Sequence, residues 1–234
     1  MGERMTVMKS EGHKPPDLDD YAKLAEQFVP GRQAIFVIVE ASLLELLPPG
    51  PARILVLGAG GGEELLRLGR NNPDWSFVGV DTNETMVDLA RRRLADTPVS
   101  ARSELHVTTI DRLDDKHFDA ATCILTAHFV PDDGAKLAFL KDIHARMKPG
   151  APLAIVDGVG VAGEERTELL RRIWIRHAIR NGVPEAHAVS NGENFKKVAV
   201  VSEEREEELL TNAGFERLTP MFRGLAIKGW LAFA

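Results

Sequence analysis

The stretch Arg53–Gly69, which reads RILVLGAGGGEELLRLG, decides the fold. Its apolar run at 54–57 predicts a buried strand, and this strand leads directly into the glycine-rich segment Gly58–Gly62. Leucines at helical spacing follow, so a helix is expected over 62–70. A strand, a tight turn and the start of a helix bring backbone N–H groups and the positive end of the helix against a ligand.

Strands and helices keep alternating downstream of this turn. Such alternation produces a parallel sheet with helices on both faces, because each crossover between parallel strands is right-handed. The expected strands are 53–57, 75–80, 104–108, 118–124 and 151–157, and the expected helices are 62–70, 83–95 and 133–147.

The two ends of the chain depart from this alternation. Two helices are expected before it, at 18–28 and 32–47. After it we expect a long helix at 163–181, an irregular stretch at 182–201 and an acidic helix at 202–213. Two closely spaced strands, 215–222 and 225–233, are typical of an antiparallel hairpin. The fold class is therefore α/β, with a mostly parallel sheet that ends in this hairpin.

The expected domain organisation follows from these elements. Residues 1–16 are expected to form a disordered leader and 17–50 an N-terminal helical cover. One ligand-binding domain is expected over 51–234, with an insertion at about 158–201.

Composition limits the function classes. The 234 residues carry a net charge of −6, which argues against a general nucleic-acid binder. Cys123 is the only cysteine, so neither an internal disulfide nor a cysteine metal cluster can form. The longest apolar run, 35–39, is far too short to span a bilayer, and no signal peptide is apparent. We expect a soluble, cytoplasmic protein without a membrane partner.

Two classes of ligand use a glycine turn of this kind. A dinucleotide site usually reads G-x-G-x-x-G, but the third glycine would fall at Glu63, whose carboxylate would repel a pyrophosphate. A nicotinamide oxidoreductase is therefore disfavoured. Asp81 ends the next strand, 19 residues after Gly62, where it can accept hydrogen bonds from both hydroxyls of an adenosine ribose. The alternative for Asp81 is a helix N-cap, although Thr82 or Asn83 could serve as well.

From Arg53 to about Asp157 the sequence resembles the class I S-adenosylmethionine (SAM)-dependent methyltransferases. The resemblance rests on ILVLGAGGGEELLRL, FVGVDTNETMVDLARRRL, HFDAATCILTAHFV and LKDIHARMKPGAPLAIVDGV, and on the closing segment LLTNAGFERLTPMFRGLAIKGWLAFA. It implies a Rossmann-like methyltransferase sheet, SAM as cofactor and S-adenosylhomocysteine as product. By the same resemblance, Gly58, Gly60 and Gly62 pass beneath the methionine portion of SAM, and Asp81 holds the ribose.

The resemblance also implies further cofactor contacts. Asp111 is expected near the adenine, with an ordinary turn residue as the alternative. Arg32 is expected either to bind the SAM carboxylate or to be a surface arginine at a helix start. The family's usual acidic residue two positions before the first glycine is Val56 here, and Ile110 stands where the adenine-facing carboxylate is first expected. The remaining expected cofactor residues are Ala59, Thr82, Met86, Leu125 and Thr126.

In overall layout the chain is similar to carboxy-SAM synthase and related small methyltransferases. FVPGRQAIF, FVPDDGAKLAFLKDIHARMKPG and NAGFERL carry this likeness. Arg32 stands where the synthase has a tyrosine, and Ser190 and Asn191 stand where it has a basic residue for an extra carboxylate. Ordinary methyl transfer is therefore favoured over carboxy-SAM synthesis.

The chemistry is expected at the carboxyl end of the sheet. His128 follows the fourth strand and is the candidate general base, with a capping or packing role as the alternative. Helix 163–181 and the N-terminal helices are expected to cover the substrate. Trp174, Arg176 and Arg180 are the candidate substrate residues; the alternatives are a core tryptophan and a solvated face with local ion pairs such as Glu168 to Arg172.

The sequence thus predicts a SAM-dependent methyltransferase (EC 2.1.1.-) that acts on a small acceptor, for which an anionic molecule is one option. The alternatives are a catalytically silent SAM- or partner-binding protein and an enzyme of SAM or tRNA modification. The partner is expected to be a small-molecule substrate rather than nucleic acid. Helix 32–47 could serve a homodimer as readily as a lid.

Overall fold

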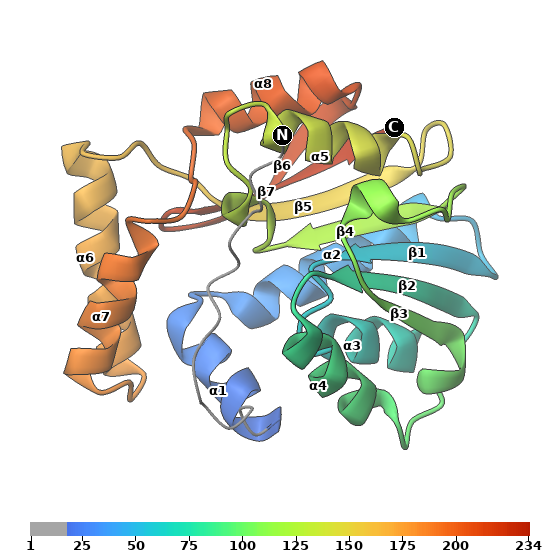
Figure 1. Cartoon of the computed structure of the whole chain (residues 1–234), viewed down its shortest axis with the longest axis horizontal. Coiled ribbons are helices and arrows are strands. Elements are labelled where there is room, and N and C mark those ends of the chain that lie inside the picture. The colour runs from blue at the N-terminus through green and yellow to red at the C-terminus, as the bar shows by residue number, and fades with distance from the viewer. Residues whose placement is uncertain (1–17) are drawn as a thin grey trace, which may run out of the picture.

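A computed structural model describes residues 18–234 and contains a seven-stranded sheet in the order β3-β2-β1-β4-β5-β7-β6 (Figure 1). The leader predicted at 1–16 lies outside the described residues. The strands are β1 Ala52–Leu57, β2 Trp75–Asp81, β3 Ser103–Val107, β4 Ala120–Ile124, β5 Pro152–Gly158, β6 Glu216–Gly224 and β7 Ile227–Phe233. The α-helices are α1 Leu18–Phe28, α2 Arg32–Leu46, α3 Glu63–Asn71, α4 Glu84–Leu94, α5 Ala135–His144, α6 Glu165–Arg180, α7 Glu185–Phe195 and α8 Glu203–Ala213.

The sheet is parallel from β3 through β5, and β7 pairs antiparallel with both β5 and β6. The predicted fold class and the predicted C-terminal hairpin are therefore confirmed. From β1 the chain proceeds outward to β2 and β3, then returns to β4 on the other side of β1. The carboxyl ends of β1 and β4 thus flank the point where the strand order reverses, which is where open α/β sheets bind ligands.

Helices cover both faces of the sheet (Figure 1), and an apolar cluster lies between the sheet and each layer of helices. Ile35, Val39 and Leu43 of α2 pack with residues of α3 and with the β1 side chains that face them. On the other face, α5 and α8 pack over β4, β5 and β7. The buried side of α2 has the helical spacing predicted from the sequence, yet Val37 and Leu44 on its other side are exposed.

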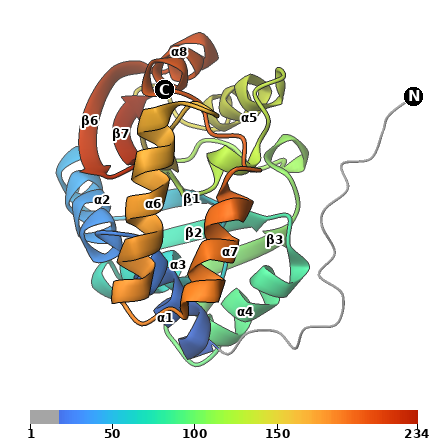
Figure 2. The same cartoon turned by 90° about the vertical axis from the view of Figure 1, so that its left-hand side faces the viewer.

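A separate helical unit stands at one end of the sheet, where α6 and α7 lie beside α1 (Figure 2). Phe28, Ala178, Val183 and Ala188 form its small apolar core, and Trp174 packs against it. The irregular stretch predicted at 182–201 is wrong, because α7 occupies most of it. The run Ser190-Asn191-Gly192 within α7 has weak helix propensity, so burial against α6, as at Ala188, helps to stabilise the helix.

The other predicted elements agree with the structure to within a few residues at each end. The predicted helix 133–147 is shorter because Gly134 adopts a left-handed conformation at its start. Three short 3-10 turns complete the fold: η1 Ser100–Arg102, η2 Ile110–Arg112 and η3 Ala127–Phe129. Among residues 18–234, no helix combines the length and apolar character that a membrane span requires.

Candidate functional site

The glycine turn joins β1 to α3, and Gly58, Gly60 and Gly62 all have positive φ. A Cβ at Gly60 would meet only the Gly58 carbonyl oxygen at 3.6 Å and the Met86 methyl at 3.8 Å, both ordinary contacts. Packing therefore does not require a glycine at position 60, where the partly exposed backbone lies beside Met86. A ligand could approach the main chain closely at this position.

The other two glycines face protein. A Cβ at Gly58 would lie 2.1 Å from the Thr126 Oγ1, and one at Gly62 would lie 2.9 Å from the Ala90 Cα. Internal packing thus accounts for the missing side chains at Gly58 and Gly62. Their predicted contact with a cofactor stays a prediction.

Asp81, at the end of β2, fixes the shape of this turn. Its Oδ2 accepts a hydrogen bond from the Gly60 N–H at 2.9 Å, and its Oδ1 accepts one from the Asn83 N–H at 2.8 Å. The N-cap of α4 is Asn83, whose side chain accepts from the Met86 N–H, so the alternative of Asp81 or Thr82 as the cap is wrong. Each Asp81 oxygen keeps a second lone pair for a hydroxyl donor.

The segment after β4 lies against the same turn. The Thr126 Oγ1 is 3.3 Å from the Leu57 carbonyl oxygen and 3.2 Å from that of Ile124, to one of which the hydroxyl donates. Leu125 has a left-handed φ of 54°, and its N–H donates to the Val156 carbonyl at 2.7 Å. The structure therefore brings the predicted residues Leu125 and Thr126 beside Gly58.

Within the described residues, Asp111 makes no hydrogen bond or ion pair with the glycine turn or with Asp81. It lies in η2 and is exposed, and only its carbonyl oxygen is held, by the Arg146 guanidinium at 3.1 Å. The preceding residue, Ile110, is buried in the core, so a carboxylate at that position would be costly. The contact between Asp111 and adenine stays a prediction.

His128 lies in η3 and is buried against β5. Its Nδ1 is hydrogen-bonded to the Oδ1 of Asp157, a carboxylate at the carboxyl end of β5 that has no solvent exposure. Asp157 thus fixes the imidazole and leaves Nε2 as the ring nitrogen for another partner. The imidazole is thus both packed in the core and oriented by Asp157, and its role as a general base stays a prediction.

Two more buried ionisable side chains continue from this pair. Lys136 of α5 lies with its Nζ 3.9 Å from the Asp157 Oδ2 and 3.3 Å from the Glu206 Oε2 of α8. Burial, and then the negative charge of Asp157, raises the pKa of Glu206, against the opposing effect of Lys136. Burial also raises the pKa of the Cys123 thiol well above its usual value, which agrees with an inert core cysteine.

Sequence reasoning missed Asp157, Lys136 and Glu206. One signal was available, because Lys136 and Glu206 occupy helix positions whose neighbours at i+4 and i+3, Leu140 and Leu209, face the core. Lys136 and Glu206 are 70 residues apart in the sequence, so no local pattern could show that they pair.

Arg32 belongs to an ion-pair cluster around Glu63. The Glu63 carboxylate lies 2.7 Å from Arg32, 3.2 Å from Arg67 and 3.9 Å from Arg93. Burial raises the pKa of Glu63, but hydrogen bonding to Arg32 and the charges of Arg32, Arg67 and Arg93 outweigh this effect and lower it. The Arg32 side chain is 11% exposed, so the surface-arginine alternative is wrong. Because its charge is compensated, Glu63 is also a weaker argument against a pyrophosphate than the sequence suggested.

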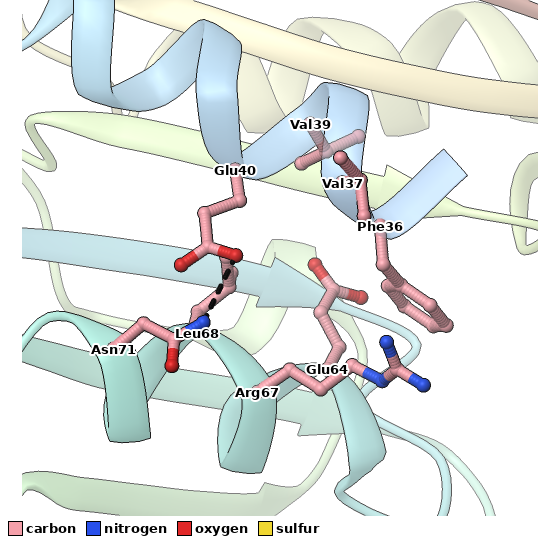
Figure 3. Close-up of a pocket in the computed structure, with 8 residues that line it drawn as sticks. All are labelled: Phe36, Val37, Val39, Glu40, Glu64, Arg67, Leu68 and Asn71. Carbon is pink, nitrogen blue, oxygen red and sulfur yellow. Dashed lines mark hydrogen bonds between the residues drawn. The ribbon is translucent and has the colours of Figure 1, made fainter. Parts of the chain in front are cut away.

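A cavity of about 140 Å³ opens between α2 and α3, close to this cluster. Figure 3 shows the Glu64 side chain rising from α3 toward α2 within it. Glu64 is 8% exposed, and its Oε1 is buried without a hydrogen-bond partner. Burial raises the pKa of Glu64 to about 7, against the smaller opposing effects of the Thr122 hydroxyl and the Arg32 charge. The lining residues are Phe36, Val37, Val39, Glu40, Glu64, Arg67, Leu68 and Asn71.

The three predicted substrate residues lie on α6, away from the glycine turn (Figure 1). Trp174 stacks 5.0 Å from the Phe28 ring and 5.9 Å from the Phe195 ring, as its core alternative requires. Arg176 and Arg180 are exposed. Glu168 pairs with Arg171 at 2.8 Å, so the ion pair expected with Arg172 is wrong.

The sequence of this chain is similar to those of known methyltransferases. A family model described as "Methyltransferase domain" matches residues 55–153. Carboxy-S-adenosyl-L-methionine synthase of Campylobacter fetus subsp. fetus (strain 82-40) is 23% identical over 211 residues, covering 90% of this chain and 88% of that protein. The ubiquinone/menaquinone biosynthesis C-methyltransferase UbiE of Geobacter sp. (strain M21) is 30% identical over 111 residues, which span 46% of each chain.

Solved structures share the fold. A SAM-dependent methyltransferase from Aquifex aeolicus superposes with a TM-score of 0.59 at 20% identity, covering 92% of this chain and 98% of that one. The residues of the turn fit an adenosine cofactor, since the backbone at Gly60 is partly exposed and Asp81 keeps acceptor capacity. The chain thus carries a methyltransferase domain at residues 55–153 and is similar in sequence and in fold to SAM-dependent methyltransferases.

Proposed function

We propose that the protein transfers the methyl group of SAM to a small-molecule acceptor that loses a proton, with His128 as the general base. The buried His128–Asp157 pair carries this proposal, because it orients an imidazole at the carboxyl edge of the sheet. Thr126, two residues before His128, contacts the glycine turn. We therefore propose that the base and the cofactor-binding turn lie at the same carboxyl edge of the sheet.

The residues of the turn take separate roles in binding. Asp81 accepts hydrogen bonds from the ribose hydroxyls while it holds the Gly60 N–H. Gly60 and Ala59 allow close approach of the main chain, and Met86 and Thr82 flank the adenosine. Leu125 and Thr126 contribute backbone contacts from the β4 side, and Asp111 faces the adenine.

When bound, SAM supplies an activated methyl group, so the chain's own task is to orient, desolvate and deprotonate the acceptor. Asp157 holds Nδ1, and His128 Nε2 takes the proton as the acceptor atom forms its bond to the methyl carbon. With SAM bound, transfer of the methyl group would leave S-adenosylhomocysteine as the product, and the proton of the acceptor would stay on His128 Nε2.

The acceptor is proposed to be small and anionic and to enter beneath α1, α6 and α7. Arg176 and Arg180 are exposed on α6, where they could draw a carboxylate or phosphate toward the site. Carboxy-SAM synthesis is disfavoured because Ser190 and Asn191 offer no cation, and Arg32 is paired with Glu63. Arg32 would bind the SAM carboxylate only by sharing its guanidinium with Glu63. A cytoplasmic location and a homodimer formed through α2 complete the proposal.

The first test is calorimetric titration of the protein with SAM, S-adenosylhomocysteine and NAD. We expect micromolar or tighter binding of the first two and no binding of NAD. Asp81→Ala should weaken S-adenosylhomocysteine binding at least tenfold, about 1.4 kcal/mol. The matched control is Asp88→Ala, which removes an exposed carboxylate of α4 that pairs with Arg91. Binding of NAD in place of SAM would refute the cofactor assignment.

Turnover is tested by formation of S-adenosylhomocysteine from SAM in the presence of a panel of phenols, hydroxy acids and amines. His128→Gln should retain S-adenosylhomocysteine affinity and lose at least a hundredfold in rate on any acceptor that the wild type methylates. Equal rates for the variant and the wild type would exclude His128 as the base. Tight SAM binding without turnover on any acceptor would favour a silent binding protein.

A further inference from the structure

We propose that Glu64 binds the α-ammonium group of the methionine portion of SAM, an inference that rests on the proposed function. Glu64 lies in the first turn of α3, two residues after Gly62, so it belongs to the same backbone segment as the glycine turn. Its carboxylate lines the cavity between α2 and α3, and its Oε1 is buried without a partner (Figure 3).

The other charged groups that line this cavity are already paired. Glu40 accepts hydrogen bonds from the side chains of Asn71 and Asn72, at 3.2 and 3.1 Å. Arg67 binds Glu63 and Gln33 and lies 4.8 Å from the centre of the Phe36 ring. Among the described carboxylates of this lining, Glu40 is thus paired, whereas the Glu64 Oε1 has no hydrogen-bond partner.

Glu64 also lies close to the centre of the sheet. The Thr122 hydroxyl on β4, which pairs with Val56 on β1, lies close enough to Glu64 to lower its pKa, yet neither the Thr122 Oγ1 nor the Glu64 Oε1 forms a well-aligned hydrogen bond. Two unsatisfied polar atoms thus lie together beneath the carboxyl ends of β1 and β4. A ligand group that donates several hydrogen bonds could satisfy both.

The chemistry of the missing donor follows from burial. An ionised carboxylate removed from water needs a cation or several N–H donors to offset its desolvation. SAM offers two cationic groups, a sulfonium without any hydrogen-bond donor and a primary ammonium with three. The ammonium is the group that can satisfy Glu64. The first-turn position of Glu64 favours its ionised form further, because the helix dipole is positive there.

Binding of an ammonium should change the protonation of Glu64. With a pKa of about 7 in the unliganded protein, the carboxyl is about half protonated at neutral pH. The ammonium favours the ionised form, so binding releases about half a proton at pH 7. The titratable or charged groups near Glu64 are Arg32 and Glu40 of α2, Arg67 of α3 and Cys123 of β4.

The experiment compares S-adenosylhomocysteine with 5′-methylthioadenosine, which has the same adenosine and thioether but lacks the amino-acid portion. Both are titrated calorimetrically at pH 7, in two buffers of different ionisation enthalpy, into the wild type, Glu64→Gln and the control Glu40→Gln. Glu64→Gln should weaken S-adenosylhomocysteine binding at least tenfold and leave 5′-methylthioadenosine unchanged. Glu40→Gln should change neither affinity.

Proton release provides a test that needs no variant. The wild type should release about half a proton with S-adenosylhomocysteine and none with 5′-methylthioadenosine, and Glu64→Gln should release none with either. Unchanged affinity in Glu64→Gln, equal loss for both ligands, or wild-type binding of S-adenosylhomocysteine without proton release would each overturn the assignment. Failure of the wild type to bind S-adenosylhomocysteine would instead refute the proposed function.

Discussion

The three glycines of the turn between β1 and α3 lack side chains for different reasons. Gly62 packs against the backbone of α4 at Ala90, and Gly58 packs against Thr126, whereas a Cβ at Gly60 would make only ordinary van der Waals contacts. From the sequence all three were assigned to cofactor approach. The structure assigns only Gly60 a surface where a ligand could meet the backbone.

This difference predicts that binding and stability can be separated. Gly60→Ala should cost only the left-handed backbone, about 1–2 kcal/mol, yet weaken S-adenosylhomocysteine binding at least tenfold. Gly62→Ala should cost roughly 1–3 kcal/mol more, because its Cβ would overlap the Ala90 Cα. Urea denaturation and calorimetry on both variants measure the two effects. Equal loss of stability in both would contradict the packing argument.

The raised pKa of Glu64 predicts that the stability of the unliganded protein depends on pH. Its pKa rises from 4.5 to about 7 on folding, so the folded state holds a proton that the unfolded state releases between these values. Stability is therefore lost as pH rises through this range, by up to about 3 kcal/mol at 1.36 kcal/mol per pH unit. Glu64→Gln cannot ionise and avoids this loss.

Urea denaturation at pH 5 and pH 8 measures the effect. The gain in unfolding free energy of Glu64→Gln over the wild type should grow by roughly 2–3 kcal/mol between these pH values. Glu40→Gln should show no such growth, because Glu40 is held by two asparagine side chains. A gain that is the same at both pH values would contradict the raised pKa.

At the scale of elements, the helical unit of α1, α6 and α7 depends on its own small core. Trp174 links all three helices, since its ring lies against Phe28 of α1 and Phe195 of α7. Gly192 of α7 lets α6 approach closely, because a Cβ there would lie 2.4 Å from the Ile175 Cδ1. This unit was predicted as a substrate cover, and Trp174 as one of its substrate residues.

Trp174→Ala should therefore loosen the three helices together. Loss of the aromatic contacts should lower the free energy of local opening by about 2–3 kcal/mol. Hydrogen exchange should increase across α1, α6 and α7 and stay unchanged in α4. Ile173→Ala is the matched control, because the Ile173 side chain, next to Trp174 on α6, is exposed. Faster exchange confined to α6 would contradict this role.

At the scale of the whole molecule, the buried ionisable side chains connect α5 and α8 to the sheet. His128 and Asp157 lie at the ends of β4 and β5, and Lys136 and Glu206 extend the cluster through α5 to α8. Such a cluster is costly to desolvate and is held only when each charge has a partner. It therefore ties α5 and α8 to the edge where His128 is proposed to act.

Lys136→Met should destabilise the protein by about 3 kcal/mol, because it leaves two buried carboxylates without their cation. Adding Glu206→Gln should restore part of this loss, with a coupling free energy of at least about 1 kcal/mol in a double-mutant cycle. Urea denaturation of the two single variants and the double variant measures it. Additive losses would show that Lys136 and Glu206 do not interact across α5 and α8.

The sequence by itself determined the order of strands and helices, the glycine turn, the C-terminal hairpin and the acidic end of β2. These features depend on residues that are close along the chain, so hydrophobic periodicity, glycines and turn residues reveal them. The same local signals failed at α7, because that helix depends on packing against α6 rather than on its own propensity.

Only the tertiary structure decided which charges meet. His128 and Asp157 are 29 residues apart, Arg32 and Glu63 are 31 apart, and Lys136 and Glu206 are 70 apart. Each pair is formed by the way strands and helices stack, which a pattern of neighbours in the sequence does not encode. Burial then sets the chemistry of these groups, because the cost of removing a charge from water depends on the surrounding fold.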